Sequence, residues 1–590
     1  MRVSTSGDVA VGTSAGAGAV GTSAGAAGVR EGGVPEGGVP KDGVPKDGAP
    51  EGGVPTWPEL RPDIEFLPPE EGERSWTIAD ERYRRFTRLG GGAAALLRGL
   101  DGTRDLQQVR HDLGPGVAQE QVEAALRKFT ELGLLVGTDT PPVKESRFRF
   151  QPPASLQFTV LDRPAFLAPG RLLPRLMANR VVAAGCLLAV LAGLVAVSLG
   201  AAEIAKAAWH PMPWQHWLIA AAVVIAVNAV HELAHGAVLA RFGGRPHRIG
   251  AMLFYCAPAM FCDVTDLWRL RTRHQRVLVA LAGVICQLAA AGLLAAGSAL
   301  CDGELAELLG LCALMTAFTG ILNLLPFIRL DGYIALMAWV NIPNLRDKSM
   351  ADCRAVVNWT VFGGPRPERT LPDGWAVFGA FCLLYPWVLV FNLLVIAHGS
   401  LMAYGAWGAL SWLSLLAGTV GYVLYRLARM YRASGARNPL RGLVTLAALG
   451  AALIALGQSQ PHTEKAYGAY TTAGGRVEVA FPDAPGVLPP VSGGSVELMH
   501  GGILGRRTVG SGTTGQEDGR KKAPLDRFVP FEGVPGELDV RSYHLSSVAL
   551  RDGAPSRGVA VAEAGTTTWL GHVNRLAVKD PWKTLADGLW

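Results

Sequence analysis

The sequence predicts a mainly α-helical membrane protein: a helical bundle of about seven spans, with a small N-terminal α+β domain of winged-helix type and a C-terminal β-rich soluble tail. Two observations favour this fold class. Hydrophobic residues form 49% of the 590-residue chain, which is a high share for a soluble protein. They are concentrated in long apolar runs between residues 180 and 457, whereas the flanking segments have the patterns of linkers and small globular domains.

Residues 1–55 consist of short repeats. Two similar copies occupy residues 11–19 and 20–28, and five pentads of the form EGGVP, KDGVP or KDGAP follow up to Pro55. A segment with almost no large apolar side chains cannot offset the entropy that it loses on ordering. We therefore expect a disordered tether, with a specific binding role as the alternative.

Residues 56–140 show the pattern of a small α+β domain. Apolar spacing and turn signals predict one strand and three helices, the last of which ends at Gly133. The strand is expected at residues 76–78 and the helices at 83–100, 106–113 and 122–132.

This order of elements, with Leu-Asp-Gly-Thr after the first helix and Leu-Gly-Leu-Leu after the last, resembles PqqD-like leader-peptide-binding domains. Such domains accompany ribosomally made, modified peptides. The resemblance implies that an extended peptide binds by strand addition beside the strand at Trp76 and the last helix, which carries Phe129. The alternative is a winged helix that binds no peptide.

A linker over residues 141–179, rich in proline and arginine, leads to the apolar runs. Each run is long enough, or nearly so, to cross about 30 Å of hydrocarbon. The spans are expected at 181–202, 215–240, 277–300, 306–328, 375–397, 403–425 and 440–457, within a transmembrane domain over residues 180–457.

Arginine placement predicts the orientation of these spans. Clusters of arginine precede the first span and follow the second, fourth and sixth, so all of them lie on one side of the membrane. By the positive-inside rule this side is the cytoplasm. We expect a multi-pass protein of the cell membrane with a cytoplasmic N-terminus and an extracytoplasmic tail over residues 458–590.

Charge and cysteine content narrow the partners. The net charge of +6 is modest and concentrated between apolar runs, which suits contact with membrane lipid and not with nucleic acid. All eight cysteines lie between residues 186 and 382, and we expect neither a disulfide framework nor a Cys-x-x-Cys zinc site. The tail reads as short strands joined by turns, and its histidines His500, His544 and His572 have no metal-ligand spacing.

The second span contains the motif His231-Glu232-Leu233-Ala234-His235. Histidines four residues apart lie on one face of a helix, where both imidazoles reach one Zn²⁺ ion. Glu232 is then placed to take a proton from a water molecule that zinc activates, which generates the nucleophile for an amide carbonyl. Each ionisable group in an apolar span costs at least ~2.5 kcal/mol unless it is paired or ligating, so a chance occurrence of all three is improbable.

A catalytic zinc site needs a third protein ligand. Asp331, in the sequence Asn323-Leu-Leu-Pro-Phe-Ile-Arg-Leu-Asp331-Gly332 at the end of the fourth span, is the candidate. The second and fourth spans run in the same direction and carry their polar residues toward the same end. We therefore expect the two parts of the site to meet at similar depth near the cytoplasm.

These two motifs resemble those of the site-2 protease family of intramembrane zinc metalloproteases. The resemblance covers residues 205–340, and Ile328 and Arg329 stand where many members have proline, as in a peptide-processing branch. It implies that His231, His235 and Asp331 ligate zinc, that Glu232 is the general base, and that Asn323 orients the substrate or the oxyanion.

The apolar piece over residues 249–261 is too short to span a membrane. We interpret it as a membrane-dipping hairpin that offers an edge to an extended substrate, with an interfacial packing loop as the alternative. Asp263 and Asp266, which follow it, are expected to cap or to pair with Arg269 and Arg271 and not to bind metal.

The leading functional hypothesis is a zinc metalloendopeptidase that matures a ribosomally made, modified peptide by removing its leader. A second hypothesis is regulated intramembrane proteolysis of a membrane-anchored signalling protein. A third is a non-catalytic protein for peptide binding, export or immunity, which would have no need of Glu232.

Overall fold

A computed structural model describes most of the chain and divides it into two compact units. The first comprises Met1–Leu188, Ile225–Leu288 and Thr319–Asn344, and the second comprises Ala189–Val224, Ala289–Phe318 and Leu345–Trp590. Of the predicted tether only residues 11–14 are described; the rest of it lies outside the described residues. The described ranges are 11–14, 57–70, 75–80, 82, 85–112, 119–137, 147–151, 155–209, 212–254, 257–367, 370–372, 374–402, 404–433, 439–473, 476–484, 486–501, 506–529, 531–532 and 534–587.

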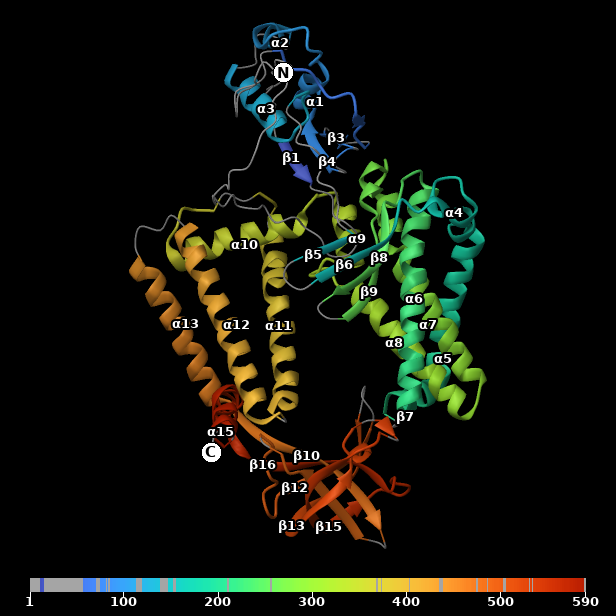
Figure 1. The fold of residues 1–590 in the computed structure, drawn as a ribbon, viewed down its shortest axis with the longest axis vertical. Helices are drawn as coiled ribbons and strands as arrows, with labels where there is room; N and C mark the ends of the chain where they lie inside the picture. Colours follow the sequence, from blue (N-terminus) through green and yellow to red (C-terminus); the bar gives the residue numbers. More distant parts are fainter. Residues whose placement is uncertain are drawn as a thin grey trace, which may run out of the picture. The chain divides into compact units, whose positions relative to one another are not determined.

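The first unit begins with a four-stranded sheet and three helices (Figure 1). The strand order is β1-β4-β3-β2, and each neighbouring pair is antiparallel. One face of this sheet and the helices bury a common core that includes Leu89, Leu97, Leu126 and Phe129. The elements are β1 (Val11–Ser14), β2 (Ile64–Leu67), β3 (Ser75–Asp80), β4 (Arg85–Gly90), α1 (Gly91–Arg98), α2 (Leu106–Asp112) and α3 (Gln119–Glu131).

Three expectations for this region need correction. The first half of the helix predicted over residues 83–100 is strand β4, because three consecutive glycines, Gly90 to Gly92, interrupt the chain and Phe86 and Leu89 pack on the sheet. Residues 11–14 of the predicted tether form strand β1 beside β4. Strand β3, which carries Trp76, has β2 and β4 as neighbours and is therefore not an edge.

Among the described residues, seven helices are long and apolar enough to cross a membrane, in agreement with the number of predicted spans. They combine with separate β-sheets, as expected for a helical membrane protein with β-containing domains. Helix α8 ends at Asn323, five residues before the predicted end, and Pro326, which has no N–H to donate, follows shortly. The helices are α5 (Arg180–Trp209), α6 (Trp214–Arg241), α7 (Arg273–Leu300), α8 (Gly303–Asn323), α11 (Trp375–Met402), α12 (Gly405–Ala433) and α13 (Pro439–Ser459).

A second antiparallel sheet in the first unit has the order β5-β6-β8-β9. The predicted hairpin is present as β8 (Arg248–Phe254) and β9 (Ala257–Cys262), with Ile249 opposite Cys262. Strands β5 (Phe148–Gln151) and β6 (Ser155–Asp162) come from the predicted linker and extend the sheet on the β8 side. Strand β9 is consequently at the edge.

Helix α9 (Asp331–Val340) starts at the predicted third metal ligand. Its second residue must be glycine, because a Cβ on Gly332 would lie 2.1 Å from the carbonyl oxygen of Leu324. Gly332 therefore lets the N-terminus of α9 pack against the chain that leaves α8. Helix α10 (Leu345–Phe362) follows in the second unit.

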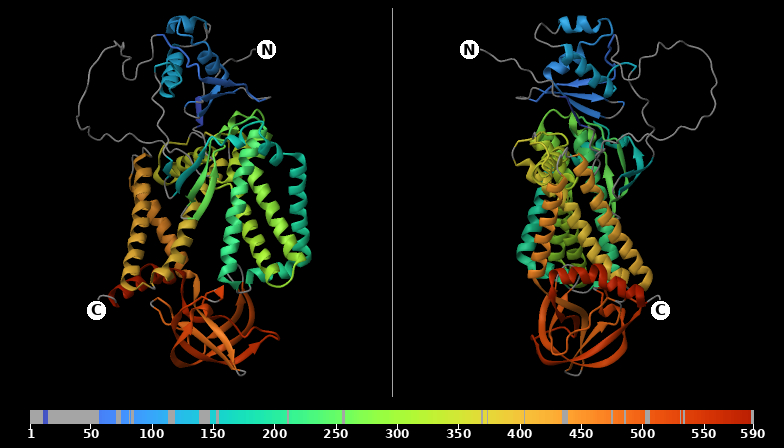
Figure 2. Two further views of the ribbon diagram at one scale, coloured as in Figure 1. Left: turned by 45° about the vertical axis from the view of Figure 1, so that its right-hand side comes forward. Right: turned by 90° about the vertical axis from the view of Figure 1, so that its left-hand side faces the viewer.

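The C-terminal part of the second unit contains a closed six-stranded barrel (Figure 2). The β-rich prediction is therefore confirmed in outline, although several strands are longer than the short ones expected. Tyr470, Phe481 and Leu498 are among the side chains that fill the barrel. In barrel order the strands are β10 (Pro461–Ala473), β11 (Arg476–Pro482), β15 (Glu537–Leu550), β13 (Arg506–Pro524), β12 (Ser495–Gly501) and β16 (Arg557–Thr568).

A short strand pair and a C-terminal helical segment also belong to the second unit. A short parallel pair joins β7 (Met212–Pro213) to β14 (Phe531–Glu532). After the barrel the chain forms α14 (Trp569–Asn574), a π-helical turn at Arg575–Lys579 and α15 (Asp580–Asp587). These C-terminal turns carry the charged residues that pair with the start of β10.

Candidate metal centre

Helix α6 carries both histidines of the motif on one face. The sequence before them is almost entirely apolar, so the helix is stable only where its surroundings are apolar too. His231 and His235 are nevertheless 3% and 2% exposed, and Glu232 between them is 5% exposed. Three ionisable side chains are thus buried within two turns of one apolar helix, and each of them needs a partner.

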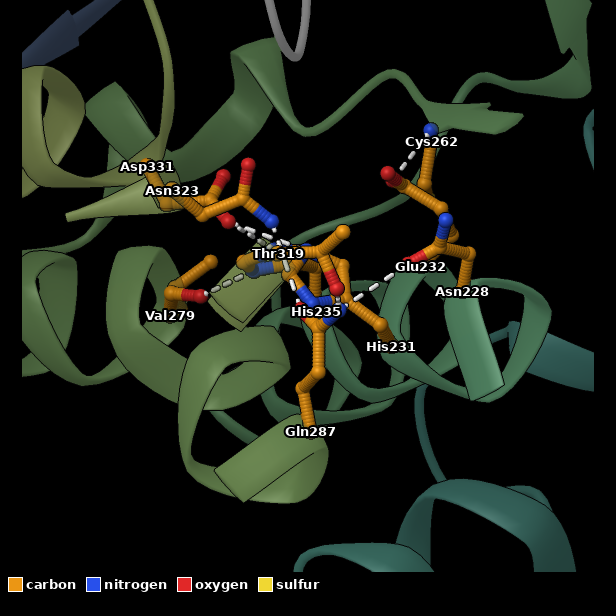
Figure 3. Close-up of polar contacts among 10 residues, drawn as sticks. All are labelled: Asn228, His231, Glu232, His235, Cys262, Val279, Gln287, Thr319, Asn323 and Asp331. Carbon is orange, nitrogen blue, oxygen red and sulfur yellow. Dashed lines mark hydrogen bonds and ion pairs between the residues drawn. The ribbon is translucent and has the colours of Figure 1, made fainter. Parts of the chain in front are cut away.

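Asp331 supplies a common partner for the two histidines (Figure 3). Its Oδ2 atom lies 2.9 Å from Nε2 of His231 and 3.3 Å from Nε2 of His235. The two Nε2 atoms are 3.1 Å apart. Three potential ligand atoms from α6 and from the start of α9 therefore form a nearly regular triangle, and Asp331 itself is only 2% exposed.

The dimensions of this triangle fit a zinc ion. Bonds of about 2.0–2.1 Å in tetrahedral geometry separate neighbouring ligand atoms by about 3.3 Å. The Oδ2 atom of Asp331 is buried and makes no hydrogen bond of good geometry with the described residues. A carboxylate oxygen that faces two imidazole nitrogens in this way is suited to share a cation with them. A metal ion bound to three protein ligands leaves a fourth position for water or substrate.

Gly283 of α7 provides the space beside these nitrogens. A Cβ at this position would lie 2.4 Å from Nε2 of His235 and 2.6 Å from Nε2 of His231. Any larger residue would therefore occupy the side of the triangle that faces α7. The glycine leaves the space beside the histidine nitrogens unfilled by a side chain of α7.

The backbone of α7 also orients one of the ligands. Nδ1 of His235 lies 2.6 Å from the carbonyl oxygen of Val279. Since a carbonyl can only accept, the hydrogen of the neutral ring is on Nδ1, and Nε2 keeps its lone pair toward the triangle. Such a contact fixes the tautomer that a metal-bound histidine requires.

Glu232 is held by the edge strand of the second sheet. Its Oε2 atom accepts a hydrogen bond of 2.7 Å from the main-chain N–H of Cys262, the last residue of β9. Burial raises the pKa of the Cys262 thiol well above its ordinary value. The carboxylate is thus fixed close to the histidine pair by a strand that was predicted to contact substrate.

Asp263 and Asp266 are engaged as structural acceptors. Asp266 pairs with Arg269 at 3.0 Å and accepts from the main chain of Arg245, as the ion-pair prediction implies. Asp263 pairs with Arg248 at 3.4 Å and accepts from Thr265. Its partner is therefore Arg248, on the neighbouring strand, and neither Arg269 nor Arg271.

Asn323 lies at the end of α8 and belongs to the same polar region. Its Nδ2 atom donates to Oε1 of Gln287 on α7 at 3.3 Å (Figure 3). Gln287 and Gly283 were not singled out in the sequence. Gln287 could have been, because an amide in the middle of an apolar span is as unusual there as the histidines of α6.

The two residues predicted to bind a leader peptide lie elsewhere in the first unit. Phe129 is fully buried in the core of the N-terminal domain, so it stabilises the fold and offers no surface to a peptide. Trp76 is partly buried on β3, with the guanidinium of Arg98 4.4 Å above its ring. The structure does not bring either residue to the metal centre.

A second group of possible ligands lies in the barrel domain, where His462 and Glu464 of β10 approach His572 of α14. The Glu464 carboxylate is already occupied, because Arg575 donates to both of its oxygens at 3.1 and 2.7 Å. A guanidinium on the carboxylate repels a cation, so this cluster is better described as a buried ion pair between the barrel and the C-terminal turns.

No family model matches the chain, and no curated protein or solved structure was found to match it.

Proposed function

We propose that this chain is a membrane-embedded zinc metalloendopeptidase of the site-2 protease type. One observation carries the proposal: two histidines and an aspartate place their free ligand atoms within 3.3 Å of one another, and a buried glutamate stands next to the first histidine. Three ligands with an adjacent carboxylate are the set used for metal-assisted hydrolysis. A purely structural site would use a fourth protein ligand.

The proposed roles follow from the positions of these side chains. Zinc, when bound, would supply Lewis-acid activation of water and of the scissile carbonyl. Glu232 accepts a proton from the attacking water and delivers it to the leaving nitrogen, so its carboxylate must be both ionisable and fixed in position. The N–H of Cys262 meets the second requirement. Asn323 offers an amide to the main chain of the substrate.

Strand β9 gives the substrate a place to bind. The main-chain N–H of Asp263, the residue after β9, donates to the carbonyl oxygen of Arg248 at 2.7 Å. In an antiparallel ladder, successive residues direct their N–H and C=O groups to opposite sides of the strand. Cys262 and Met260 therefore direct their main-chain groups away from β8. The N–H of Cys262 is used by Glu232, and the polar groups of Met260 remain for an added strand. A peptide bound there in extended form would run toward Glu232.

The N-terminal domain contacts the same region of the first unit, which favours a peptide substrate with a leader segment. Arg276, at the start of α7, pairs with Glu70 at 3.0 Å. Arg88 of β4 donates to the carbonyl oxygen of Asn341 at 2.8 Å. A cavity of about 340 Å³ between these contacts is lined in part by Arg269 and Arg271. We infer that a leader held by this domain delivers the cleavage site to β9, and that the product is a mature modified peptide.

The proposed placement has the N-terminus and the metal centre toward the cytoplasm and the barrel outside. The arginine clusters of the sequence support this placement. The alternative functions are cleavage of a membrane-anchored signalling protein and peptide binding without catalysis. Peptide binding without catalysis would give no role to the hydrogen bond between Glu232 and Cys262.

The decisive experiment compares wild-type protein with Glu232→Gln in lipid or detergent. Zinc content is measured by mass spectrometry of the metal, and candidate precursor peptides are analysed for cleavage. We expect equal zinc in both proteins and cleavage only by wild type. Cleavage by Glu232→Gln at the wild-type rate would rule out the proposed base, and equal peptide binding without cleavage by either protein would favour the non-catalytic alternative.

A further inference from the structure

Helix α7 provides none of the proposed metal ligands, but one of its faces lies beside the candidate metal centre. Val279, Gly283 and Gln287 are four residues apart and therefore lie on one face of the helix. The carbonyl oxygen of Val279 contacts Nδ1 of His235, and Gly283 leaves room beside the Nε2 atoms of both histidines. The third, Gln287, continues the same face one turn further and approaches Asn323.

Gln287 is completely buried and its amide is fully used. Its Nε2 atom donates to Oδ1 of Asn228 at 3.1 Å and to Oγ1 of Thr319 at 2.7 Å. Its Oε1 atom accepts from Nδ2 of Asn323 at 3.3 Å. One side chain thus connects α6, α7 and α8, at positions close to the predicted metal ligand His231 and to the end of α8 (Figure 3).

The connections fix the direction of the Asn323 amide. Both N–H groups of Gln287 have acceptors, so Oε1 is the atom that remains to face Asn323, and it can only accept. Asn323 must therefore turn its nitrogen toward Gln287. Its second N–H and its carbonyl oxygen make no hydrogen bond with the rest of the described chain, which leaves one donor and one acceptor for a peptide main chain.

We propose that Gln287 is a positioning residue for the hydrolysis reaction, acting through Asn323. The inference rests on the proposed peptidase function. By holding one N–H of Asn323, Gln287 aligns the other with the carbonyl of the bound peptide, where charge develops during attack. Asn228 and Thr319 keep Gln287 itself from rotating. The substrate class is an extended peptide, because only a main chain offers a carbonyl and an N–H at regular spacing to this amide and to β9.

The test uses full-length protein with Gln287→Met, which keeps the length and volume of the side chain without its hydrogen bonds. We expect kcat to fall about 10- to 100-fold, as is typical when a supporting hydrogen bond is lost, while KM changes less than about threefold. Zinc content should equal that of wild type. Asn323→Ala should lower kcat at least as much, and the double variant should be no worse than Asn323→Ala alone.

Ser298→Ala is the matched control, because Ser298 is another buried polar residue of α7 and donates to Ala306 at 2.7 Å away from the metal centre. We expect wild-type kinetics for it. Wild-type cleavage by Gln287→Met would overturn the inference and leave the proposed function intact. Loss of zinc from Gln287→Met, or additive effects in the double variant, would also overturn it, because the residue would then act on the fold or independently of Asn323. A wild-type protein that binds zinc and cleaves no peptide would overturn both proposals.

Discussion

The main-chain N–H of Cys262 donates to Oε2 of Glu232 at 2.7 Å, so the edge strand β9 ends on the proposed general base. In the proposed mechanism, substrate binding and proton transfer would therefore depend on the same few backbone atoms. This relationship makes the hairpin a part of the site and not only a support for it.

Cys262→Pro should lower kcat/KM about 10- to 100-fold, because proline removes the N–H and a hydrogen bond to a charged group contributes about 1.5–3 kcal/mol. Cys262→Ala keeps the N–H and loses only the protonated thiol, so it should retain most of the activity. Peptide cleavage and zinc content of the two variants provide the measurement. Equal activity in both would show that the bond to Glu232 is dispensable.

Gly283→Ala should abolish zinc binding. The added methyl group would lie 2.4 Å from Nε2 of His235, and neither the helix backbone nor the histidine can move far enough without breaking its contact with Val279. Gly297→Ala on the same helix is the control, since a Cβ there meets nothing closer than 3.4 Å. Metal analysis of the purified proteins checks the prediction, and full zinc occupancy in Gly283→Ala would contradict the assigned position of the ion.

Removal of the metal should destabilise the protein. A ligand that binds only the folded state adds about 2.7 kcal/mol of stability at one hundred times its dissociation constant. A chelator should therefore lower the melting temperature of wild type and abolish cleavage, and added zinc should restore both. Asp331→Asn, which lacks the carboxylate of the third ligand, should show little response of its melting temperature to zinc. A wild-type response in that variant would argue against Asp331 as a ligand.

Arg61→Met should destabilise the N-terminal domain by about 3–5 kcal/mol, the cost of removing one member of a buried ion pair. Arg61 and Asp80 pair at 3.0 Å, with 4% of each side chain exposed, and Arg61 also donates to the carbonyl oxygen of Gly133 at 2.7 Å. Arg104→Met, which breaks an exposed pair with Asp101, should cost less than about 1 kcal/mol. Denaturant unfolding of residues 1–145, which include strand β1, would compare the two, and similar midpoints would contradict the prediction.

The barrel domain should lose stability in acid. Burial alone would raise the pKa of Glu464, but its hydrogen bonds with Arg575 and His572 outweigh burial and hold the pKa below the ordinary value of 4.5. A carboxyl with a lowered pKa in the folded state contributes stability above its unfolded value and loses it as pH falls through the folded value. Melting temperatures should therefore decline as the pH falls below about 4.5.

Glu464→Gln isolates this contribution. The pKa of Asp580 is raised by burial, so its protonation opposes the effect of Glu464 in the same pH range. Replacement of Glu464 should make the decline of melting temperature shallower and leave the opposing effect in place. An unchanged pH profile in the variant would assign the acid sensitivity to another group.

Much of the fold could be predicted because its cause is local. An apolar run of about twenty residues has few alternatives to a membrane-spanning helix, and the seven long helices coincide with the seven runs. The start of the N-terminal domain was harder, since Phe86 and Leu89 are spaced three apart and suit a helix as well as a twisted strand. Only the packing of β4 between β1 and β3 decides between them.

The residues of the candidate site likewise differ in whether the local sequence indicates their role. His231 and His235 are neighbours on any helix, so their spacing alone indicated a shared metal. Gln287 stands out as an amide within an apolar span, but its partners could be found only in the tertiary structure, because they come from two other helices. The pair of Glu464 and Arg575 is more than one hundred residues apart and could be found only in the folded barrel domain.

The closed barrel of the second unit has a consequence for recognition. Every strand in the ring β10-β11-β15-β13-β12-β16 has a neighbour on both sides, so this domain presents no row of free main-chain donors and acceptors to an incoming chain. The described sheet that ends at β9 has an outer strand there, on which Met260 directs its main-chain groups away from β8. An unfolded polypeptide therefore finds no strand in this ring to extend, and the barrel must distinguish its surroundings through its side chains and loops.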